Sequence, residues 1–234
     1  MKENISEGNH TADERNSTFI RLGGLLILLG LTIHIVANMV LRTFPTENLT
    51  STQLKVYLSD EAGTWAIIHG LRYVAIVCIV VFSAGLFMKT RGTRSSSATG
   101  WGIVGLLGTA LMMTNLMITN GIEILAFRDF NDLFEQKQLF WLLFNLTRVL
   151  FTAEIIAWAI LILGFSMAGR ISASIPKWLV KFGLLSASIC LLSAVFIVSV
   201  LSEGWALILI EVASLAGLVW FVCVGVYMLL RKAF

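Results

Sequence analysis

The chain has 234 residues, of which 57% are hydrophobic and only 13% are charged, and its mean hydropathy is +0.86. Soluble domains carry about a quarter charged residues, so this composition excludes an ordinary soluble domain. The formal net charge of +3 is small and spread over short loops, which argues against nucleic acid as a partner. Cys78, Cys190 and Cys223 lie in apolar runs, so they predict buried apolar residues and no disulfide framework.

Residues 1–18 are polar, mixed in charge and free of the short apolar core of a signal peptide, so we expect a disordered cytoplasmic tail. Since a helix rises about 1.5 Å per residue, about 20 apolar residues cross a bilayer. Six runs of roughly that length or more follow in chain order: 19–41, 64–88, 101–127, 139–167, 178–201 and 205–230. The sequence therefore predicts an all-α fold, a polytopic transmembrane bundle of six helices, with a short cytoplasmic end at 231–234.

The charges that flank the predicted helices alternate along the chain. Three segments carry cations without acids: Lys89, Arg91 and Arg94; Arg170 and Lys177; and Arg231 and Lys232. The other three connections are mixed or acidic. Because positively charged loops stay in the cytoplasm, we predict that both termini are cytoplasmic and that the chain spans a bacterial-type cytoplasmic (inner) membrane.

Polar and ionisable side chains recur inside these runs, although hydrocarbon disfavours them strongly. The candidate site residues among them are His34, Asn38, His69, Arg72, Tyr73, Asn120, Glu123, Asn145, Arg148 and Glu211. At about 1.5 Å per residue, most of these lie roughly 7 to 14 Å below the outer surface, whereas Asn115 and Glu154 lie deeper. Five of the six helices thus contribute to one polar layer in the outer half of the membrane, and the inner half is almost purely apolar.

We interpret this layer as an outward-facing pocket that binds a small polar or amphiphilic ligand in transport or sensing. Arg72 and Arg148 would hold an anionic group by forked hydrogen bonds. Glu123 or Glu211 would take up and release protons. If the charges pair with one another, neighbouring helices favour Glu123 with Arg148, and matching depth favours Glu211 with Arg72.

Other interpretations stay open. The layer could be an interhelical network that fixes helix register. His34 and His69 lie at similar depth on consecutive helices, so they are candidate ligands for haem iron or, with a carboxylate, for a metal ion.

The chain could also be a non-catalytic partner subunit of a membrane complex or a homo-oligomer, because Gly102, Gly105 and Gly108 permit close helix approach. The cofactor stays unknown. The sequence has no HExxH, GxSxG or P-loop signature, so an enzyme is not indicated.

Short motifs give one resemblance. The pattern Trp65-x-x-x-His69, followed by Gly105 and Gly108 and then by Asn120-Gly121, resembles uncharacterised bacterial six-helix integral membrane proteins. The resemblance covers most of the bundle and implies the same six-helix fold, with no established activity to transfer. In those proteins an acidic residue is common directly before the position of Gly121. This chain has Asn120 there, so no charge is carried over to that place.

Overall fold

The computed structural model describes residues 3–40, 50–91, 95–128, 137–196 and 204–230, and these form an all-helical bundle. The helices in this part of the chain are α1 (Glu3–Val40), α2 (Ser51–Arg91), α3 (Ser96–Arg128), α5 (Lys137–Ile171), α6 (Lys177–Ala194) and α7 (Gly204–Leu230). Each contains a segment that is long and apolar enough to cross a membrane. The predicted fold class, a six-helix transmembrane bundle, is therefore confirmed.

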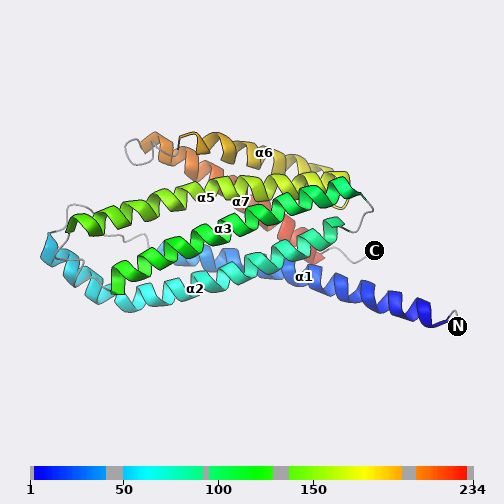
Figure 1. The fold of residues 1–234 in the computed structure, drawn as a ribbon, viewed down its shortest axis with the longest axis horizontal. Helices are drawn as coiled ribbons and strands as arrows, with labels where there is room; N and C mark the ends of the chain where they lie inside the picture. Colours follow the sequence, from blue (N-terminus) through cyan, green and yellow to red (C-terminus); the bar gives the residue numbers. More distant parts are fainter. Residues whose placement is uncertain (1–2, 41–49, 92–94, 129–136, 197–203, 231–234) are drawn as a thin grey trace.

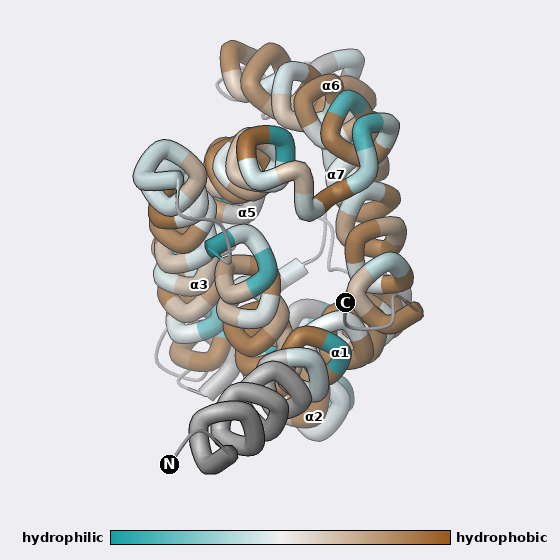
Figure 2. Tube along the Cα trace, turned by 90° about the vertical axis from the view of Figure 1, so that its right-hand side faces the viewer, coloured by the Kyte–Doolittle hydropathy of each residue, from teal (hydrophilic) through white to brown (hydrophobic). Residues whose placement is uncertain are grey.

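Successive helices run in opposite directions, so α1 begins and α7 ends at the same end of the bundle, which we call the end of the termini (Figure 1). Each helix packs against its neighbours in the chain, and α7 returns to pack against α1. The view along the bundle shows this closed order, with α1 and α2 beside each other and α6 farthest from them (Figure 2). Contacts between α2 and α5, and between α5 and α7, join opposite sides.

Helix α1 is longer than the sequence predicts. It begins at Glu3, whereas the candidate span within it begins at Ser17. The backbone of residues 3–16 continues the spanning helix toward the amino terminus, and the disordered tail expected there stays a prediction. Extending an existing helix adds a hydrogen bond per residue without a new nucleus, and this segment contains no proline to stop it.

Helix α2 also begins before its predicted span, at Ser51. A capping box starts it: the Gln53 backbone N–H donates to Thr50 Oγ1 at 3.3 Å, and the Thr50 N–H donates to Gln53 Oε1 at 2.9 Å. Helix α6 ends at Ala194, earlier than the predicted boundary, and residues 197–203 lie outside the described residues. At the start of α2, local capping therefore sets a boundary that hydropathy alone cannot set.

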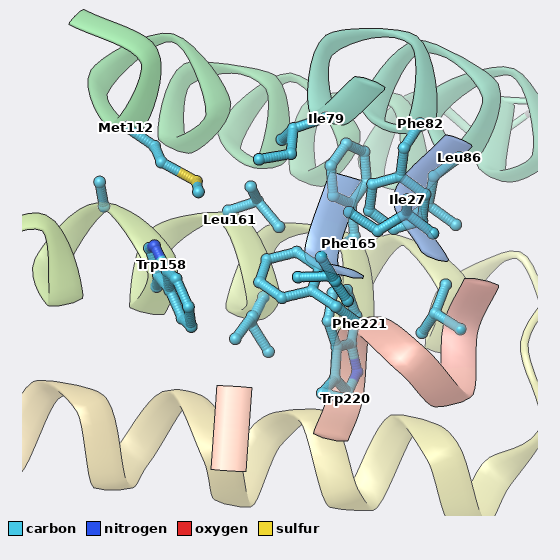
Figure 3. Packing of buried hydrophobic residues seen from close by; sticks show 14 of the residues in the cluster. Ile27, Ile79, Phe82, Leu86, Met112, Trp158, Leu161, Phe165, Trp220 and Phe221 are labelled. Carbon is cyan, nitrogen blue, oxygen red and sulfur yellow. The ribbon is translucent and has the colours of Figure 1, made fainter. Parts of the chain in front are cut away.

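The largest apolar core lies in the half of the bundle nearer the termini. It joins Phe82 of α2 with Trp158 and Phe165 of α5 and Phe221 of α7. The rings of Trp158 and Phe221 meet edge to face, with centroids 5.4 Å apart (Figure 3). This packing leaves the opposite half of the bundle as the place where buried charge gathers.

Glycines bring α3 and α5 into backbone contact. A Cβ added to Gly108 would lie 2.7 Å from Leu161 Cα, and one added to Gly164 would lie 2.6 Å from Gly105 Cα. Gly102 faces the ring of Phe87 on α2. The glycine row on α3 is therefore used for packing within the chain, which removes the sequence-based reason to reserve it for a partner helix.

Candidate functional site

A cluster of four buried polar side chains joins α2 and α3 in the half of the bundle opposite the termini. His69 and Arg72 are three residues apart on α2, and Asn120 and Glu123 are three apart on α3, so each pair shares one helix face. The two helices are antiparallel neighbours, which brings the pairs together. The exposed fraction is 3% for His69, 9% for Arg72, 1% for Asn120 and 8% for Glu123. We call these four residues the polar cluster.

The Arg72 guanidinium is the centre of this cluster. Its Nη1 donates to Glu123 Oε2 at 2.5 Å and to Asn120 Oδ1 at 3.1 Å. His69 Nδ1 lies 3.3 Å from Asn120 Oδ1 and 3.7 Å from Glu123 Oε2. One cation is thus compensated by one carboxylate, as a buried charge in a membrane requires.

An aromatic side chain covers the imidazole. The rings of Trp65 and His69 have centroids 5.6 Å apart and planes inclined by 34°. Trp65 is only 2% exposed and belongs to a small apolar group with Ala37 of α1 and Ile68. Sequence reasoning did not place Trp65 in the site, although its four-residue spacing from His69 on one helix was the signal that could have found it.

Two atoms of the polar cluster are buried without a hydrogen-bond partner among the described residues. They are Nε2 of His69 and Nδ2 of Asn120. A buried polar group without a partner costs about 1–3 kcal/mol, and the large majority of buried side-chain polar atoms in proteins are paired. The cluster therefore combines a satisfied ion pair with unused hydrogen-bonding capacity.

The other predicted site residues are spread around the bundle. His34 on α1 is partly buried. Tyr73 and Glu211 are exposed on α2 and α7, and Asn145 is partly buried on α5. The side chains of Asn38 and Arg148 lie outside the described residues.

The observed ion pair differs from the pairing that helix order and depth suggested. Arg72 contacts Glu123, whereas depth had favoured Glu211 as its partner. Glu211 projects from the exposed face of α7, a helix that packs mainly against α1 and α6. The physical reason is the rotation of each helix about its axis. Two residues at equal depth meet only if the helix faces that carry them point toward each other.

A second set of polar contacts lies deeper in the bundle. The amide of Asn115 on α3 donates to the Leu150 carbonyl on α5 at 2.6 Å. Glu154 is 4% exposed, and its Oε1 accepts from Trp158 Nε1 at 2.8 Å. Of these two contacts below the polar cluster, the one made by Asn115 joins α3 to α5, and the one made by Glu154 stays within α5.

No group of three His, Cys, Asp or Glu side chains in the described part of the chain is arranged to hold a metal ion. His69 contacts Glu123, but no third ligand joins them there. A His–His–carboxylate centre built on His34 and His69 therefore lacks its geometry among these residues.

Comparisons with known proteins return no match: no family model, curated protein or solved structure is similar to this chain.

Proposed function

We propose that this chain is a multi-pass protein of the cytoplasmic membrane that binds a small polar or amphiphilic ligand at the polar cluster, in transport or sensing. One observation carries the proposal: His69 Nε2 and Asn120 Nδ2 are buried, unpartnered and next to the Arg72–Glu123 ion pair. A ligand that supplies the missing hydrogen bonds offsets the cost of burying these two atoms.

The distribution of basic residues supports the direction from which the ligand enters. Lys89 and Arg91 end α2, Arg170 ends α5, and Lys177 and Lys181 begin α6, all at the end of the bundle where the termini lie. Positively charged helix ends stay in the cytoplasm. The polar cluster then belongs to the outer half of the membrane, and the ligand reaches it from outside the cell or from the outer leaflet.

A purely structural network is the main competing explanation. The Arg72–Glu123 pair alone would cross-link α2 and α3 with its charges balanced. Such a network does not require a further imidazole and amide whose atoms are buried and unpaired, because burying unpaired polar atoms only lowers the free energy of unfolding. This surplus favours a binding site over a cross-link.

The test compares two substitutions of the same chemistry on the same helix. The full chain, Asn120→Leu and Asn115→Leu would each be purified from membranes, and their bound small molecules extracted and quantified by mass spectrometry. We expect a small polar or amphiphilic compound with the wild type and Asn115→Leu, and its loss from Asn120→Leu. Identical extracts from all three proteins would overturn the proposal.

A further inference from the structure

The hydrogen-bonding roles within the polar cluster define the chemical class of the ligand. This inference rests on the proposed function and deepens it. We propose that the ligand is an uncharged amphiphile whose head group both donates and accepts a hydrogen bond, such as a hydroxyl or a primary amide.

The Asn120 amide has only one orientation that fits its contacts. Its Oδ1 lies 3.1 Å from Arg72 Nη1, and a guanidinium can only donate. The oxygen must therefore face Arg72, and the unpartnered atom is the Nδ2 amino group. Asn120 thus offers the ligand a hydrogen-bond donor.

The tautomer of His69 follows from the same contacts. Its Nδ1 faces the acceptors Asn120 Oδ1 at 3.3 Å and Glu123 Oε2 at 3.7 Å, so Nδ1 carries a proton and donates. In a neutral imidazole the other nitrogen is then an acceptor. The unpartnered Nε2 of His69 therefore offers the ligand a hydrogen-bond acceptor.

The charge balance of the cluster argues against a charged head group. Arg72 already has the carboxylate of Glu123 at 2.5 Å, in a place where both side chains are about nine-tenths buried. An anion would have to displace Glu123 or leave it without its cation, and a cation would meet Arg72. The anionic ligand expected from the sequence is therefore the less favourable class.

The surroundings suit an apolar body attached to this head group. Trp65, Ala37 and Ile68 form the small apolar group beside the imidazole, and lipid-facing Leu and Val side chains cover the outer faces of α2 and α3. A hydroxyl or amide can donate to His69 Nε2 and accept from Asn120 Nδ2, while its alkyl chain stays in apolar surroundings.

The test uses four probes with one alkyl chain and different head groups: octanamide, methyl octanoate, octanoate and octylammonium. Each is titrated into the full chain in lipid nanodiscs, and binding is followed by the thermal unfolding midpoint. Octanamide should bind about tenfold more tightly than methyl octanoate, which lacks the donor, and more tightly still than the two ions. Asn120→Asp, which replaces the donor with an acceptor, should lose octanamide binding, and Asn115→Asp should retain it.

The outcomes separate this inference from the proposed function. Tighter binding of octanoate or octylammonium, lost in Asn120→Asp, would overturn the uncharged class and leave ligand binding in place. Equal binding of octanamide and methyl octanoate would overturn the donor–acceptor requirement. If no probe binds but membrane extracts still contain a compound lost in Asn120→Leu, the chemical class is wrong and the site stands. If the extracts are also identical, both proposals fail.

Discussion

Breaking the Arg72–Glu123 ion pair gives the most quantitative check of the structure. Glu123→Gln keeps the shape of the side chain but removes its charge, and Arg72→Met removes the cation. Both side chains are about nine-tenths buried, so solvent screens the pair little. Removing one partner of a buried pair costs about 3–5 kcal/mol, because the other charge is left uncompensated.

The double variant separates this penalty from ordinary packing losses. If the two changes acted independently and each cost about 3 kcal/mol, the double variant would lose about 6 kcal/mol of unfolding free energy. Because the two side chains pair with each other, we expect Arg72→Met/Glu123→Gln to lose only about 3 kcal/mol. The coupling free energy is then about 3 kcal/mol. Reversible unfolding of the micellar protein by sodium dodecyl sulfate, followed by circular dichroism, measures all four free energies of unfolding.

Glu211→Gln is the matched control, because it makes the same chemical change on the exposed face of α7. We expect this variant to cost less than about 1 kcal/mol and to show no coupling to Arg72→Met. A large coupling between positions 72 and 211, with none between 72 and 123, would refute the helix rotations described above. It would restore the pairing that depth alone suggested.

Three further predictions test packing, the deeper contacts and topology. Gly164→Ala should lower the free energy of unfolding by about 1–3 kcal/mol because its Cβ meets the backbone of α3, whereas Gly70→Ala, with open space around it, should be neutral or stabilising in the same assay. Glu154→Leu should cost about 1–3 kcal/mol by leaving Trp158 Nε1 without its acceptor, and Glu154→Gln should cost clearly less. In a chain freed of native cysteines, Ser97→Cys should react with a membrane-impermeant maleimide only after cells are permeabilised, and labelling of intact cells would reverse the proposed topology.

Much of the bundle follows from the sequence because spanning a membrane is a one-dimensional requirement. Six apolar runs of sufficient length predict six helices, since every backbone group in hydrocarbon must find its partner within the segment. Depth can also be counted along each helix, so the sequence alone places His69, Arg72 and Asn120 in one layer and Glu154 below them.

The grouping within that layer was decided only by tertiary structure. Counting along the chain does not say how far each helix turns about its axis, and a turn of one residue moves a side chain by about 100°. This rotation directs Glu123 toward Arg72, leaves Glu211 and Tyr73 on exposed faces, and brings Trp65 over His69.

The same packing brings α3 and α5 into close approach at Gly108 and Gly164 and builds the aromatic core near the termini. Sequence thus determined which residues share a depth in the membrane, and packing determined which of them meet.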